Sequence, residues 1–150
     1  MSVTFNIGVH MKTIMTLILP LMISAGVWGA EPVLSDETKI LLKEAKSEVE
    51  AISPQQLKTL MEEGKIVLVD VRDPDEWEKS TITYDRQVKI SRGFLEIKYP
   101  KLILEKYNKE DTFVLYCGLE PRSVLAAQQL KHLGFKHVSY LQGGLKNFNP

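Results

Sequence analysis

The sequence predicts an α/β fold in which a mainly parallel sheet is covered by helices on both faces. Residues 67–71 and 113–116 are short apolar runs of β-favouring residues, the pattern of buried strands. Helical patterns alternate with these runs along the chain, one ending at Gly64 and another beginning at Pro121. Because alternating strands and helices pack as a parallel sheet between helical layers, this order predicts the α/β class.

The composition is that of an ordinary globular protein. The chain has 150 residues, enough for one domain with a single core, and a formal net charge of zero. This charge gives no reason to expect nucleic acid or a membrane surface as a partner. One cysteine excludes an intrachain disulfide, and the three histidines lack metal-ligand spacing. We therefore expect neither a metal nor a cofactor.

The first 30 residues have the pattern of a secretory signal peptide. Lys12 precedes an otherwise apolar or small segment, residues 13–30, which ends in small residues near a cleavage point. We therefore expect residues 1–30 to direct export to the periplasm. An uncleaved membrane anchor formed by residues 13–30 is the alternative. The start and the cleavage point remain open between Met1 and Met11 and between Gly29 and Ala30.

Residues 31–51 are predicted to form an N-terminal helical extension. Ser35 is a suitable N-cap, and acidic residues follow it in the first turn. A narrow apolar stripe is predicted on this helix at Leu41, Ala45 and Val49. The helix either packs on the surface of the domain or serves as a spacer or partner-binding segment.

A second helix and the first strand follow. Ser53 and Pro54 favour a helix start, Gly64 favours its end, and Leu57, Leu60 and Met61 should face inward. The next strand, residues 67–71, contains Asp70, and a carboxylate in a buried strand needs a partner.

The second half of the chain continues the alternation. Pro100 is expected to break the helical pattern, and residues 102–107 are expected to form another short helix. After the strand at 113–116, the helix from Pro121 should present an apolar face at Val124, Ala127, Leu130 and Leu133. Gly134 is its expected C-cap, Phe135 should close against its last turn, and residues 138–141 should form the last strand.

Cys117 has the most informative position in the chain. It follows directly on the strand at 113–116 and precedes the helix that begins at Pro121. In open α/β sheets ligands bind at the carboxyl ends of the strands, and backbone N–H groups entering a helix can cradle an anion. The positive end of a helix also favours thiolate over thiol, which makes Cys117 a candidate nucleophile. The simpler alternative is a small buried apolar residue.

The spacing around Cys117 resembles that of the rhodanese, or thiosulfate sulfurtransferase, family. Four residues separate Cys117 from Arg122, and Ser123 follows, as in the family's Cys-x-x-x-x-Arg-Ser loop. Residues 67–77 resemble the family's first strand and acidic turn, and residues 140–145 with Phe148 resemble its closing Gly-Gly turn. The resemblance implies a rhodanese-like domain over residues 52–150 with about five strands.

The resemblance also implies roles for individual residues. Cys117 would accept a sulfur atom as a persulfide, and Asp70 and Arg72 would brace the structure around the active loop. The residues implied to bind substrate are Gly118, Leu119, Glu120, Pro121, Arg122 and Ser123. Residues 80–87 depart from the family, which usually has a Gly-His-Ile-Pro-Gly-Ala run there, so the shape of this loop is left open. The resemblance resumes at residues 88–96, which implies a short strand that enters a helix.

The expected function is sulfur transfer from a donor such as thiosulfate or a persulfide to a thiol, to cyanide or to a protein acceptor. Arg122 would contact the oxyanion of the donor or the carbonyl groups of the loop, or would form a structural ion pair. Ser123 is expected to brace the loop or cap the helix, since no histidine lies near it in sequence to activate it.

Two other functions remain open. A cysteine phosphatase or arsenate reductase would need one more residue between Cys117 and Arg122 to surround a tetrahedral oxyanion. A catalytically weak module that carries sulfur or binds a partner is motivated by Glu120, where many family members have glycine. Its carboxylate would either repel an anionic donor or have little effect, because it points outward or pairs with a lysine.

Overall fold

The structure is a computed structural model that describes Met1 and residues 33–148. Residues 2–30 of the expected signal peptide lie outside this part. All the described helices and strands belong to one compact unit, Leu34–Pro150. Among the described residues, no helix is both long and apolar enough to cross a membrane.

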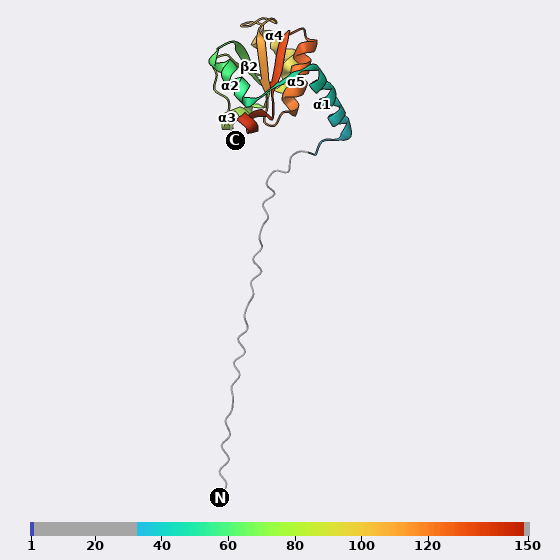
Figure 1. Ribbon diagram of the computed structural model, residues 1–150, viewed down its shortest axis with the longest axis vertical. Helices are drawn as coiled ribbons and strands as arrows, with labels where there is room; N and C mark the ends of the chain where they lie inside the picture. The colour runs from blue at the N-terminus through green and yellow to red at the C-terminus, as the bar shows by residue number, and fades with distance from the viewer. Residues whose placement is uncertain (2–32, 149–150) are drawn as a thin grey trace. The chain divides into compact units, whose positions relative to one another are not determined.

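A five-stranded sheet forms the centre of this unit (Figure 1), and every neighbouring pair of strands is parallel. The order across the sheet is β1-β5-β4-β2-β3, so β5, β4 and β2 lie inside and β1 and β3 are edges. The strands are β1 (Glu50–Ile52), β2 (Ile66–Asp70), β3 (Gln87–Lys89), β4 (Thr112–Tyr116) and β5 (His137–Leu141). The predicted parallel α/β sheet is confirmed.

Helices cover both faces, as predicted. They are α1 (Asp36–Glu48), α2 (Pro54–Glu62), α3 (Pro74–Lys79), α4 (Leu95–Leu102) with the preceding 3₁₀ turn η1 (Arg92–Phe94), α5 (Pro121–His132) and α6 (Gly144–Phe148). Alternate side chains of β2 enter opposite layers. Val67 and Val69 pack in the core with α1, α4 and α5, whereas Ile66 and Leu68 pack with α2 and α6. Both layers are apolar, which explains why β2 is an unbroken apolar run up to Asp70.

The N-terminal helix α1 begins where predicted but uses a different face. Ser35 caps it by accepting the N–H of Thr38 at 3.2 Å. The predicted stripe was wrong at Leu41, which is 54% exposed, because Leu42 is the residue that is buried with Ala45 and Val49. Leu42, Ala45 and Val49 are spaced by three and then four residues, so they lie on one face of the helix. This face packs against α5, which α1 contacts. The edge strand β1 that follows was not predicted, since only Ile52 of its three residues is buried.

Helix α2 agrees with its sequence signals. Ser53 and Gln56 form a reciprocal capping box, with Pro54 in the first turn. Leu57 is fully buried, Leu60 and Met61 pack beside it, and Gly64 takes a positive φ of 67° just after the helix.

The prediction around Pro100 was wrong. Pro100 lies inside α4, and residues 103–106 form turns in place of the short helix expected at 102–107. Pro100 and Glu96 are both exposed, so water can bond to the Glu96 carbonyl that proline leaves without a helical N–H. Ile103, which is fully buried, ties the following turn to the core.

Helix α5 carries the predicted apolar face. Val124, Ala127 and Leu130 are fully buried, and Leu133 is partly buried against the same core. The helix ends as expected, with Gly134 at φ 91° and the Phe135 N–H bonded to the Leu130 carbonyl at 3.1 Å. This packing fixes the start of α5 next to the end of β4, where Cys117 lies.

Candidate active site

Cys117 lies at the carboxyl end of β4, in the loop that leads into α5. Its exposed fraction is 1%, so the loop nearly covers it. The backbone N–H of Glu120 donates to the Cys117 Sγ at 3.2 Å, and the Ser123 Oγ lies 3.7 Å from Sγ. Ser123 in turn donates its hydroxyl to the Glu120 carbonyl at 2.8 Å. Ser123 therefore braces the turn that places an N–H on the sulfur.

The start of α6 holds the other side of the loop. The N–H groups of Leu145 and Lys146 donate to the carbonyls of Cys117 and Gly118, at 2.8 and 3.1 Å. Gly144 has a φ of 64°, and a Cβ on it would lie 2.6 Å from the Cys117 carbonyl oxygen. The close approach of the two loops therefore requires glycine at this position. This contact is the structural role of the Gly-Gly turn noted in the sequence.

Arg122 is paired with carboxylates at the start of α3. Its Nη1 and Nη2 donate to Glu76 Oε2 and Oε1, at 2.6 and 2.7 Å, and Nη1 also lies 3.4 Å from Asp73 Oδ2. The hydrogen bonds with Glu76 raise the pKa of Arg122, and the same contact lowers the pKa of Glu76. The guanidinium of Arg122 is thus permanently charged, and the Glu76 carboxylate already neutralises its charge. Of the roles considered for Arg122, the structure shows an ion pair.

Glu120 has an unusual backbone conformation. Its φ is 129° and its ψ is −45°, and it is the only non-glycine residue of positive φ among those described. Such a conformation costs about 1–3 kcal/mol in a non-glycine residue, which explains why glycine suits this position. Its carboxylate pairs with Lys46 of α1 and accepts the Gly143 N–H at 2.7 Å. Of the arrangements considered for Glu120, the structure shows the pairing with a lysine.

Asp70 and Arg72 form a buried ion pair beside this site. Asp70 is fully buried, and the Arg72 Nε and Nη2 donate to its two carboxylate oxygens at 3.0 and 2.7 Å. Arg72 also donates to the carbonyls of Glu76 and Ser80, at 3.4 and 2.8 Å. Burial by itself would lower the pKa of Arg72, but the bonds with Asp70 outweigh it and the pKa is raised. The pair joins the end of β2 to the loop after α3.

The hydroxyl of Tyr116 organises the loop whose shape the sequence left open. It accepts the Ile82 N–H at 3.2 Å and a Gln87 side-chain N–H at 2.9 Å, and it lies 3.0 Å from the Thr81 Oγ1. Burial raises the pKa of Tyr116 to about 12, so the phenol stays protonated at neutral pH. This loop is therefore held by the residue that directly precedes Cys117.

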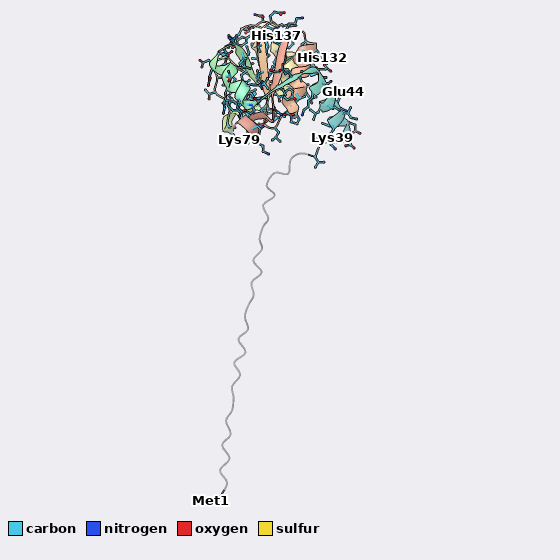
Figure 2. All side chains as sticks on the ribbon, in the orientation of Figure 1. Met1, Lys39, Glu44, Lys79, His132 and His137 are labelled. Atoms are coloured by element: carbon cyan, nitrogen blue, oxygen red, sulfur yellow. The ribbon has the colours of Figure 1, made fainter. Side chains whose placement is uncertain are left out.

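The described histidines lie away from Cys117. His132 ends α5 and His137 begins β5. The strands end on the side of the sheet where α3 and its last residue Lys79 lie, and Figure 2 shows both histidines far from Lys79. No group of three or more metal-ligating side chains is found within residues 33–148. The described site thus consists of one thiol, backbone donors and paired charges, an arrangement suited to nucleophilic attack by sulfur.

The structure brings together the residues from Cys117 to Ser123 and adds three that the sequence reasoning missed. Glu76 lies within the acidic turn that resembled the family, so its position could have been noticed. Gly143 was seen only as part of a turn. Lys46 had no signal, because one lysine among several on an amphipathic helix is normally solvated.

Comparison with known proteins identifies a family. Residues 53–150 match the rhodanese-like domain. The chain is 34% identical over 95 residues to the "Probable adenylyltransferase/sulfurtransferase MoeZ" of Mycobacterium tuberculosis. The matched region covers 63% of this chain and 23% of that protein. It is 35% identical over 94 residues to an uncharacterized protein of Synechocystis, covering 63% of this chain and 49% of that protein. The chain therefore spans at most about half of these relatives.

Two solved structures are similar over most of the chain. The polysulfide-sulfur transferase homodimer of Wolinella succinogenes is 32% identical with a TM-score of 0.63, covering 75% of this chain and 81% of that one. A protein of unknown function from Rhodopseudomonas palustris, described as a possible tyrosine phosphatase, is 30% identical with a TM-score of 0.65. It covers 80% of this chain and 94% of that one.

Proposed function

Because the chain belongs to the rhodanese-like domain family, we propose that it is a sulfurtransferase that carries sulfane sulfur on Cys117 as a persulfide. The observation that carries this proposal is the placement of the Cys117 sulfur. It lies at the carboxyl end of the central strand β4, next to the start of α5, and accepts a backbone N–H from its own loop. The N–H and the helix start both stabilise negative charge on sulfur.

The reaction has two steps. The thiolate of Cys117 attacks the outer sulfur of a donor such as thiosulfate, a new S–S bond forms, and sulfite leaves with the electron pair of the broken S–S bond. A thiolate or cyanide then attacks the terminal sulfur of the persulfide. The bond to Cys117 breaks and Cys117 leaves as thiolate, ready for another cycle.

The donor class is proposed from charge and from similarity. Arg122 is compensated by Glu76, and Glu120 is compensated by Lys46, so the loop carries little net charge toward an incoming anion. Such a site suits a persulfide or polysulfide as well as thiosulfate. The similarity to the polysulfide-sulfur transferase of Wolinella succinogenes supports the same class.

Intact-mass measurement tests the proposal. The purified protein is incubated with thiosulfate and, separately, with an organic persulfide, and the mass of the chain is measured before and after reduction. We expect a gain of one sulfur on Cys117 that a thiol reductant removes. If neither donor adds sulfur, the domain is a partner-binding module and the proposal is wrong.

A phosphatase is the second candidate, since the similar Rhodopseudomonas palustris protein is described as a possible tyrosine phosphatase. The loop length argues against it here. Four residues separate Cys117 from Arg122, and the guanidinium that would bind phosphate is held at two points by Glu76. Hydrolysis of an aryl phosphate that is lost in Cys117→Ser would favour the phosphatase.

We further propose that the chain is exported to the periplasm by residues 1–30. The apolar segment after Lys12 supports this. N-terminal sequencing of the native protein from the envelope fraction should find a new terminus near Gly29 or Ala30. An intact N-terminus in the cytosol would contradict export, and an intact one in the membrane would favour the anchor.

A further inference from the structure

The helix α1 lies outside the residues matched to the family, yet one of its side chains reaches the active loop. The Lys46 Nζ pairs with the Glu120 carboxylate, and the hydrogen bond with Glu120 raises the pKa of Lys46. The Glu120 side chain is only 16% exposed, whereas that of Lys46 is 46% exposed. The carboxylate thus lies under the lysine, between α1 and the turn that contains Gly143.

Glu120 connects this contact to the sulfur. Its N–H donates to the Cys117 Sγ at 3.2 Å, and its carbonyl accepts the Ser123 hydroxyl at 2.8 Å. The positive φ of Glu120 is unfavourable for a residue with a side chain. The turn therefore needs surrounding contacts to hold it in this conformation. Two of those contacts are made by the carboxylate, with Lys46 and with the Gly143 N–H. The direction of the N–H therefore depends on where the carboxylate is anchored.

Helix α1 is itself fixed relative to α5, which makes Lys46 an ordered anchor. Leu42 and Ala45 are buried in the core that α5 shares. At the end of α1, the Lys131 Nζ donates to the Glu48 carbonyl at 2.6 Å and the Gln128 side chain donates to the Glu48 carboxylate at 2.8 Å. Lys46, two residues before Glu48, is thus presented to the loop by the half of α1 that is attached to α5.

We propose that Lys46 is a positioning residue for sulfur transfer. It holds the Glu120 carboxylate in place, and this keeps the Glu120 N–H directed at the Cys117 sulfur. This inference rests on the proposed function and extends the active site to α1. The N–H is needed most when Cys117 carries negative charge, which is before attack on the donor and after the acceptor removes the terminal sulfur. Loss of Lys46 should therefore lower kcat more than it changes KM.

The test uses Lys46→Met, Glu120→Gln and the double variant, with Lys46→Arg as the conservative variant and Lys43→Met as the matched control. Lys43 is an exposed lysine of the same helix. Two rates are measured for each variant: turnover with thiosulfate and cyanide, and alkylation of Cys117 by iodoacetamide at one fixed pH. A thermal unfolding curve confirms that each variant is folded.

We expect Lys46→Met and Glu120→Gln each to lower kcat and the alkylation rate about three- to tenfold, with a smaller change in KM for thiosulfate because each variant leaves one charge of the pair without its partner. The double variant should be no worse than either, because residues in contact couple. Lys46→Arg should restore most of both rates, and Lys43→Met should match the wild type. Additive effects in the double variant, or unchanged rates in Lys46→Met, would overturn the inference. Because alkylation needs no sulfur donor, it tests the positioning role even if the wild type gains no sulfur and the proposed function fails.

Discussion

Arg122 and Glu76 form a two-point ion pair that joins the start of α5 to α3. The contacts are 2.6 Å between Nη1 and Oε2 and 2.7 Å between Nη2 and Oε1. Both side chains are partly exposed, at 38% and 29%. The cation nearest the active cysteine in sequence is thus supplied with its own counter-ion, so its attraction for an anionic donor is reduced.

Glu76→Gln should strengthen the binding of an anionic donor. Glutamine can still accept the Asp73 N–H that Glu76 accepts at 3.2 Å, but it no longer neutralises Arg122. Because exposed pairs are weak, we expect KM for thiosulfate to fall only about two- to fivefold. The fall should be lost as salt is added, because salt screens partly exposed charges, and KM in Glu78→Gln, an exposed control on the same helix, should match that of the wild type. A fall of the same size at high salt would show that charge is not the cause.

The same pair should make stability depend on pH. The pKa of Glu76 is lowered from its ordinary 4.5, first by the hydrogen bonds with Arg122, so the folded protein binds the proton less tightly than the unfolded chain. The contribution is therefore fully present above pH 4.5 and is lost as the pH falls through the lowered pKa. We expect the difference in free energy of unfolding between wild type and Glu76→Gln to shrink over that range in urea titrations. A difference that stays constant down to pH 3 would contradict the linkage.

Cys117→Ser should abolish sulfur transfer and leave the fold intact. The two side chains are similar in size, and a serine hydroxyl could still accept the Glu120 N–H. Thiocyanate production and intact mass after exposure to thiosulfate report the loss, and thermal unfolding reports the fold. Undiminished thiocyanate production by the folded variant would exclude Cys117 as the nucleophile.

Asp70→Asn should destabilise the protein strongly. The change leaves the Arg72 charge buried without its counter-ion, and breaking a buried pair from one side costs about 3–5 kcal/mol. Urea unfolding measures the change in free energy. Asp75→Asn, whose side chain is 73% exposed, is the control and should have little effect. A loss below about 1 kcal/mol would mean that Arg72 finds other partners.

Gly144→Ala should disturb the active loop where the start of α6 packs against it. The new Cβ would lie 2.6 Å from the Cys117 carbonyl oxygen on a backbone with φ of 64°. We expect a loss of about 1–3 kcal/mol in stability together with reduced sulfur transfer. Gly93→Ala is the matched control, since a Cβ there would meet nothing within 4 Å. Equal behaviour of the two variants would show that the close approach of α6 is not needed.

The order of strands and helices was available from the sequence because it depends on local patterns. The apolar runs of β2 and β4, the caps at Ser35 and Ser53 and the stop at Gly134 involve residues only a few positions apart. The place of Cys117 between a strand and a helix follows from the same patterns. Local signals were misleading at Pro100, where solvent exposure lets a proline remain inside a helix.

Only the tertiary structure decided which residues meet across the chain. Arg122 meets Glu76 from 46 positions away, and Lys46 reaches Glu120 from a helix outside the family match. Leu42 replaces Leu41 on the buried face of α1 because the position of α5 selects the face. Charge pairing and helix facing depend on distances that exist only after the sheet has assembled, and sequence spacing does not encode those distances.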